Sequence, residues 1–113
     1  MRAAGMPPGD SVLGSLKNGL KVIVEDGVAK LPDRSAFAGS VATADMLVRN
    51  MITLADVPLT DAVQMASLTP ATILKINDKK GSVEVGKDAD ILIFDERINI
   101  GMTIIGGKVV YER

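Results

Sequence analysis

The chain has 113 residues, of which 47% are hydrophobic and 24% charged, with a net charge of −1. This composition is typical of a globular domain, and the absence of a basic surplus argues against a nucleic-acid partner. Because it contains neither Cys nor His, disulfides, thiolate metal sites, a cysteine nucleophile and a Ser-His-Asp triad are excluded. No apolar run approaches the ~18 residues of a membrane span, so we expect a soluble, cytoplasmic protein without membrane contact.

The first 41 residues predict one hairpin between irregular segments. Residues 1–19 are rich in Gly and Pro, which indicates a loop. Two strand-like runs over 20–31 flank Asp26-Gly27, and a hairpin is expected because Gly27 accepts the positive φ that such a turn requires. Residues 32–41 look irregular again. The apolar face of the hairpin therefore lacks an evident partner.

Apolar residues recur at helical spacing over 43–76. Thr43 can cap a first helix, which should end before Val57-Pro58. A second helix is expected to start at Thr60. A third, short helix is expected from Thr69-Pro70, because proline fits the first turn of a helix.

After Asn77 the apolar period changes to about two, which is typical of strands. We expect strands over 82–85 and 91–94. A hairpin over 102–111 should turn at Gly106-Gly107. The chain is therefore predicted to be α/β, with elements that look like pieces of a larger body.

The stretch GKDAD (86–90) places two acids beside a lysine, directly before an apolar strand. Two carboxylates are too few for a metal site, which needs several converging oxygen ligands. We therefore interpret it as a turn, with Lys87 and Asp88 in solvent and Asp90 bonded to local amides at the start of the strand. Lys79-Lys80 is interpreted as a solvated turn.

The segment Phe37-Ala38-Gly39-Ser40 is a second candidate site. Small residues follow one bulky apolar side chain just before a predicted helix, and Gly39 would let a ligand approach the backbone closely. The ordinary start of a helix explains the segment equally well. The Gly-rich residues 5–15 precede a strand-like run, which favours a connecting loop over a phosphate cradle.

Three segments together resemble the C-terminal end of the metal-dependent amidohydrolase superfamily. They are GSVEVGKDADILIFD (81–95), MTIIGGKVVYE (102–112) and SLTPATILKI (67–76). In that superfamily the chain leaves a (β/α)8 barrel and completes a small β-sandwich. The resemblance implies that residues 1–76 are the C-terminal end of the barrel and that residues 77–113 are sandwich strands.

AFAGSVATADMLVRNMI (36–52), with residues 2–14 and 21–31, looks like the N-acetylglucosamine-6-phosphate deacetylase family. The resemblance implies an enzyme of amino-sugar catabolism that hydrolyses N-acetylglucosamine-6-phosphate to glucosamine-6-phosphate and acetate. Two alternatives stay open: a dihydroorotase-like or imidazolonepropionase-like amidohydrolase, and a non-catalytic structural or interaction fragment.

The resemblance also implies which residues act. The family's divalent metal, zinc or similar, and its catalytic aspartate belong to segments that precede the matched region. We therefore expect this chain to carry no metal ligand and no catalytic residue, and to be inactive alone. Phe37, Ala38 and Gly39 match the family segment that lines the substrate pocket near the sugar, with Phe37 where leucine is usual.

An isolated C-terminal fragment would expose the helix faces that pack against the rest of a barrel. Met46, Met51 and Ile52 lie on such a face. Exposed apolar patches favour association, so we expect a homo-oligomer or an aggregation-prone chain.

Overall fold

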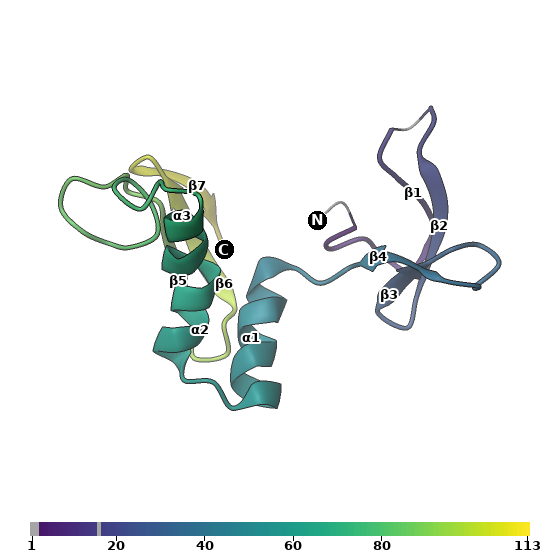
Figure 1. Ribbon diagram of the computed structural model, residues 1–113, viewed down its shortest axis with the longest axis horizontal. Coiled ribbons are helices and arrows are strands. Elements are labelled where there is room, and N and C mark those ends of the chain that lie inside the picture. The colour runs from purple at the N-terminus through teal and green to yellow at the C-terminus, as the bar shows by residue number, and fades with distance from the viewer. Residues whose placement is uncertain (1–2, 16) are drawn as a thin grey trace. The chain divides into compact units, whose positions relative to one another are not determined.

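The computed structural model describes residues 3–15 and 17–113 (Figure 1). The chain divides into two compact units, Met1–Thr43 and Ala44–Arg113, and each unit contains one antiparallel sheet. Within the described residues, no helix combines the length and apolar character needed to cross a membrane. The elements are β1 Gly9–Leu13, β2 Leu20–Glu25, β3 Val28–Lys30, β4 Phe37–Ser40, α1 Ala44–Ala55, α2 Leu59–Ala66, α3 Leu68–Ile73, β5 Ile91–Phe94, β6 Ile100–Ile105 and β7 Lys108–Glu112.

The first unit is a four-stranded sheet in the order β1-β2-β3-β4. The predicted hairpin is confirmed as β2 and β3, with Glu25 opposite Val28 across the turn at Asp26-Gly27. The core of this unit is small and aliphatic. Val22 and Val24 lie two positions apart, so their side chains share one face of β2 and pack with Ala29.

Two expectations for this unit are wrong. Residues 9–13 are not loop but form β1, which pairs with β2 from Gly9 opposite Val24 to Leu13 opposite Leu20. Residues 37–40 are not irregular but form β4, which pairs with β3. The hairpin strands would otherwise leave their outer N–H and C=O groups unpaired, and β1 and β4 supply those partners.

The three predicted helices are confirmed, and each begins within one residue of its expected start. Asp45 lies in the first turn of α1, where the helix dipole favours an acid. In α2 and α3 the buried residues are Ala62 and Ala71, while α1 buries none of its side chains fully. The helices therefore present most of their large apolar side chains to solvent.

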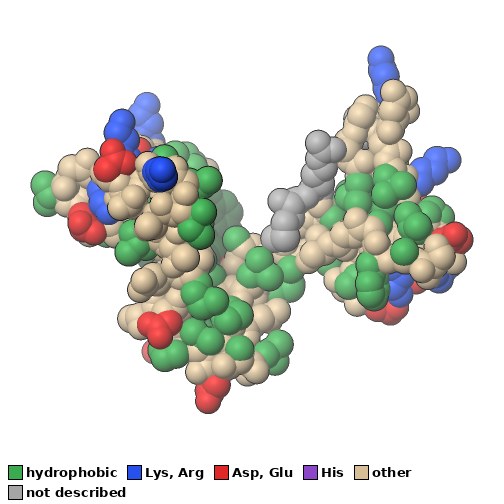
Figure 2. All heavy atoms as spheres, viewed as in Figure 1, with side chains coloured by type: hydrophobic (Ala, Val, Ile, Leu, Met, Phe, Trp, Pro, Cys, Tyr) green, Lys and Arg blue, Asp and Glu red, His purple; other side chains and the backbone are tan. Residues whose placement is uncertain are grey.

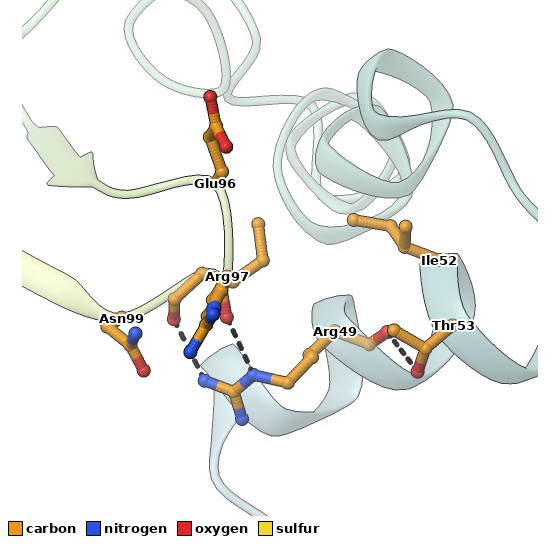
Figure 3. Close-up of a pocket in the computed structure, with 7 residues that line it drawn as sticks. Arg49, Ile52, Thr53, Glu96, Arg97 and Asn99 are labelled. Carbon is orange, nitrogen blue, oxygen red and sulfur yellow. Dashed lines mark hydrogen bonds between the residues drawn. The ribbon is translucent and has the colours of Figure 1, made fainter.

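Arg49 joins α1 to the connection between β5 and β6 (Figure 3). Its Nε donates to the carbonyl of Arg97 and its Nη2 to the carbonyl of Ile98, both at 2.9 Å. The same Nη2 lies 3.1 Å from Asp45, one turn earlier on the helix. One guanidinium thus binds two consecutive carbonyls 48 and 49 residues away in sequence.

The connection that Arg49 binds is itself tightly folded. Ile98 is 5% exposed and has a φ of 59°, a left-handed conformation that is a real outlier for a β-branched residue. The Asp95 carboxylate accepts hydrogen bonds from the amides of Arg97 and Asn99, both at 2.9 Å, and from the Asn99 side chain at 2.8 Å. These bonds hold the pKa of Asp95 below its usual range, with the Asn99 side chain as the largest cause.

The second sheet has the order β5-β6-β7, and its hairpin at Gly106-Gly107 is confirmed. The expected strand over 82–85 is wrong, because this segment is an irregular turn in which Val83 and Val85 are exposed. Gly81 and Gly86, both at positive φ, bracket it. The alternation of apolar and polar residues over 82–85 is not enough to form a strand, because no neighbouring strand among the described residues pairs with this segment.

The first prediction concerns the Arg49 contact. We expect Arg49→Met to lower the free energy of unfolding by ~1–3 kcal/mol, because two carbonyls lose their donor. Urea unfolding measures this loss of stability. Hydrogen exchange should also be faster at the Ile98 amide, which donates to the backbone carbonyl of Asp95 at 2.9 Å. Arg97→Gln is the matched control, since Arg97 offers Arg49 only its carbonyl. Equal effects of the two changes would contradict the assignment.

The second prediction concerns Gly81, whose φ is 93°. A Cβ at this position would lie 2.8 Å from the Cβ of Ala71 and 2.9 Å from the Cα of Leu68. At Gly86, with a φ of 95°, a Cβ would meet nothing within 4 Å. Gly81→Ala should therefore lower the melting temperature more than Gly86→Ala, by an overpacking cost of ~1–3 kcal/mol. Similar melting temperatures would show that α3 does not pack tightly on this turn.

Candidate functional site

The candidate segment Phe37-Ala38-Gly39 lies on β4, the edge strand of the first sheet, rather than at the start of a helix. Phe37 is 77% exposed, whereas Ala38 and Gly39 are half-buried. A Cβ on Gly39 would lie 3.7 Å from side-chain atoms of Ala3 and Leu13. The position that a Cβ on Gly39 would occupy therefore faces the core. The feature that the segment offers to a ligand is the ring of Phe37.

A hollow lies beside this ring. It is lined by Lys30, Arg34, Ser35, Ala36 and Phe37. Phe37 stands opposite Lys30 in the pairing of β3 with β4. The site thus combines an aromatic face with two cationic side chains from the adjacent strand and loop.

Both cations are already paired with acids. Arg34 binds Glu25 in bidentate fashion, with Nε to Oε1 at 2.8 Å and Nη2 to Oε2 at 3.1 Å. The Nζ of Lys30 lies 3.1 Å from Glu25 Oε1 and 2.8 Å from Asp26 Oδ2. Two positive and two negative charges meet here, so the cluster is formally neutral.

The pKa values of the cluster follow from these contacts. The hydrogen bonds of Arg34, and then of Lys30, lower the pKa of Glu25 below its ordinary value. Asp26, and then Glu25, raise the pKa of Lys30, and Glu25 raises the pKa of Arg34. These shifts keep Glu25, Lys30 and Arg34 charged near neutral pH. They suit the cluster to binding and orienting a ligand rather than to proton transfer, which works best when the pKa of the group lies near the operating pH.

The described residues do not fit a divalent metal. Across 3–15 and 17–113, no three His, Cys, Asp or Glu side chains lie together in a way that could hold an ion. Asp88 and Asp90, the acids considered from the sequence, both pair with Lys80. No metal chemistry can be derived from these side chains.

The GKDAD stretch is an architectural turn, but its side chains differ from expectation. Asp90 accepts the Gly106 amide of the β6–β7 turn at 2.8 Å, sixteen residues away rather than locally. Lys80, expected in solvent, contacts Asp90 and lies 2.9 Å from Asp88. Lys87, also expected in solvent, is mostly covered and donates to the Ser82 hydroxyl at 2.5 Å. Lys80 is held by the turn's two acids, whereas the acid near Lys87 is Glu84, at 3.4 Å.

A second hollow lies along α1 and the β5–β6 connection. Its lining includes Arg49, Ile52 and Thr53, together with residues 96–99 (Figure 3). The Arg49 guanidinium is committed to backbone carbonyls there. The hollow is therefore a packing seam, and helical spacing in the sequence gives no sign of the long-range contacts that Arg49 makes.

Comparison with known proteins gives one consistent picture. The model of the Amidohydrolase family matches residues 10–110. An N-acetylglucosamine-6-phosphate deacetylase of Danio rerio is 32% identical over 98% of this chain and 26% of its own length. The N-acetylglucosamine-6-phosphate deacetylase of Lysinibacillus sphaericus is 39% identical over 96% of this chain and 27% of its own length. An N-acetylgalactosamine-6-phosphate deacetylase of Escherichia coli O157:H7 is 35% identical over 96% and 28%.

Solved structures agree with the sequence matches. The N-acetylglucosamine-6-phosphate deacetylase of Thermotoga maritima superposes with a TM-score of 0.82 and 32% identity, over 98% of this chain and 29% of its own. A mutant deacetylase of Mycobacterium smegmatis, in complex with N-acetyl-D-glucosamine-6-phosphate, gives a TM-score of 0.77 and 28% identity, over 97% and 28%.

This chain spans about a quarter of the length of these relatives. Its homologues are amino-sugar-phosphate deacetylases, and the resemblance found in the sequence is confirmed. Since the family match extends over most of the chain, the chain belongs to the amidohydrolase family.

Proposed function

We propose that this chain is the C-terminal part of a deacetylase that hydrolyses N-acetylglucosamine-6-phosphate to glucosamine-6-phosphate and acetate. The observation that carries the proposal is the match of nearly the whole chain to such deacetylases in both sequence and structure. The N-acetylgalactosamine-6-phosphate relative makes the epimeric sugar the obvious second substrate to test.

Residues 1–76 are assigned to the C-terminal end of a (β/α)8 barrel and residues 77–113 to a small β-sandwich. Exposed apolar side chains support this assignment, because elements of a barrel and a sandwich bury such residues against neighbours (Figure 2). Leu54 and Ile73 on helices, and Leu92 and Val110 on strands, are each more than half exposed.

Within this protein, Phe37, Ala38 and Gly39 would line the substrate pocket near the sugar. The exposed ring of Phe37 beside its hollow supports the role, because apolar faces of sugars pack on aromatic rings. Ala38 and Gly39, both half-buried, would line the pocket less directly, next to the ring on the same strand.

The remaining chemistry is assigned to polypeptide outside these residues. A divalent ion, zinc or similar, would be held there, since the side chains described here do not fit one. This chain's contribution is the binding wall.

Association through exposed apolar surface is the other part of the proposal. Of the three α1 residues singled out from the sequence, Met46 is exposed and Met51 and Ile52 are half-buried. Leu47 and Leu54 add to the exposed face. Either a second copy or the rest of a deacetylase could cover this face.

The third prediction tests the function with a chimera, in which these 113 residues replace the segment that they match in the Lysinibacillus sphaericus deacetylase. We expect it to deacetylate N-acetylglucosamine-6-phosphate within about tenfold of the parent, a difference of ~1.4 kcal/mol in barrier. The chain alone, assayed for acetate release with divalent ions, should show no turnover. A folded but inactive chimera, or an active isolated chain, would refute the proposal.

The fourth prediction tests the binding wall in the same chimera. Phe37→Ala should raise KM by roughly 3- to 10-fold with little change in kcat, because the ring contributes binding that the ground state and transition state share. Phe37→Leu, which keeps an apolar side chain without the ring, should raise KM less than Phe37→Ala does. Val85→Ala, at a fully exposed position, is the control. An unchanged KM in Phe37→Ala would remove Phe37 from the site.

A further inference from the structure

The position of Phe37 depends on the loop that precedes it. This loop, residues 31–36, connects β3 to β4 and is closed by the Leu31 amide, which donates to the Ala36 carbonyl at 2.9 Å. Inside it, the Arg34 amide donates to the Leu31 carbonyl at 2.8 Å. The Asp33 carboxylate accepts the amide and hydroxyl of Ser35 at 3.0 and 2.7 Å. A short loop so closed determines where the next residue, Phe37, begins its strand.

Arg34 adopts an unfavourable backbone conformation in this loop. Its φ is 60°, in the left-handed region that costs a residue with a Cβ roughly 1–2 kcal/mol. Neither Gly nor Asn, the residues that tolerate this region best, stands here. An arginine at this position is therefore expected to offer its side chain as compensation.

The side chain of Arg34 provides that compensation at Glu25. Its two nitrogens bind the two carboxylate oxygens at 2.8 and 3.1 Å, the fork geometry that gives arginine–carboxylate pairs their directional strength. Glu25 ends β2, and Lys30 at the end of β3 binds the same carboxylate. One carboxylate thus ties the loop to two strands of the sheet.

The ion pairs of this network contribute little to the stability of the whole chain, but they act directly on the β3–β4 loop. The side chain of Arg34 is 56% exposed and that of Glu25 is 28% exposed, so the pair adds little to global stability. Two backbone hydrogen bonds and two hydrogen bonds from Ser35 to the Asp33 carboxylate also hold the loop. A modest contribution is enough to select one loop conformation, and hence one position for Phe37.

We propose that Arg34 is a positioning residue for Phe37: its bidentate grip on Glu25 fixes the β3–β4 loop and so sets the ring against an amino-sugar-phosphate substrate. The proposal rests on the proposed function for the substrate, but the grip itself is a property of this chain. Lys30 and Arg34 could instead bind the sugar phosphate directly. Their pairing with Glu25 and Asp26 argues against that, because the cluster carries no net charge to attract a dianion.

The first experiment tests the grip in the 113-residue chain by hydrogen exchange. Arg34→Gln keeps a Cβ, and so the same backbone strain, but removes the guanidinium, whereas Arg34→Lys keeps a charge without the fork. We expect the Leu31 and Arg34-position amides to exchange several-fold faster in Arg34→Gln, with Arg34→Lys intermediate. Arg97→Gln is the control for charge. Unchanged protection of Leu31 in Arg34→Gln would overturn the proposal.

The second experiment uses the chimera to test what the grip does. Arg34→Gln should raise KM for N-acetylglucosamine-6-phosphate by roughly 3- to 10-fold with kcat retained. The inhibition constant of unphosphorylated N-acetylglucosamine should rise by the same factor. A rise confined to the phosphorylated sugar would identify Arg34 as a phosphate ligand and overturn the positioning role.

A double-mutant cycle separates positioning from general destabilisation. If Arg34 acts through Phe37, the KM effect of Arg34→Gln should disappear in a Phe37→Ala background, because coupled residues are not additive. Additive effects would contradict the proposal. If the unmodified chimera is inactive, the proposed function fails on its own, and the exchange experiment still decides whether the grip exists.

Discussion

Burial of apolar surface is the constraint that this chain does not meet with its own residues. The buried hydrophobic residues among those described are Ala3, Val22, Val24, Ala29, Ala62, Ala71 and Ile98, four of them alanines. Large side chains on α1, on α3 and on all three strands of the second sheet are exposed instead. Because the hydrophobic effect scales with the area removed from water, covering these side chains with further polypeptide would be favourable. The deacetylases of Danio rerio and Thermotoga maritima, each more than three times as long as this chain, contain such further polypeptide.

Polar contacts fix the conformation of several loops and turns that the small hydrophobic cores do not hold. Arg49 fixes the β5–β6 connection to α1, Lys80 joins the turn acids, and Arg34 holds the β3–β4 loop. In each case a long cationic side chain binds groups distant in sequence or on a neighbouring strand. Such bonds contribute modestly to stability, but they are directional, so they select one conformation among several that burial alone would allow.

The contrast between small hydrophobic cores and directional polar contacts matters for the proposed site. The segment with the strongest claim to contact substrate is an exposed ring on an edge strand, and nothing in the described core constrains where that ring lies. In the positioning role proposed for Arg34, a formally neutral cluster of ion pairs beside the ring sets its place. A binding wall of this kind would recognise the apolar face of a sugar and would not bind its phosphate.

The sequence by itself determined what depends on neighbouring residues. The turns at Asp26-Gly27 and Gly106-Gly107, the three helices and the family resemblance were all predictable, because turn chemistry, helical periodicity and local motifs are written within a few positions. Only the tertiary structure decided what depends on distant partners. It turned residues 9–13 and 37–40 into strands, left 82–85 without one, and drew Lys80, Arg34 and Arg49 into ion pairs and carbonyl contacts. The Arg34–Glu25 ion pair joins residues 9 positions apart, and the Arg49 hydrogen bond to the Ile98 carbonyl joins residues 49 positions apart. No local period carries that information.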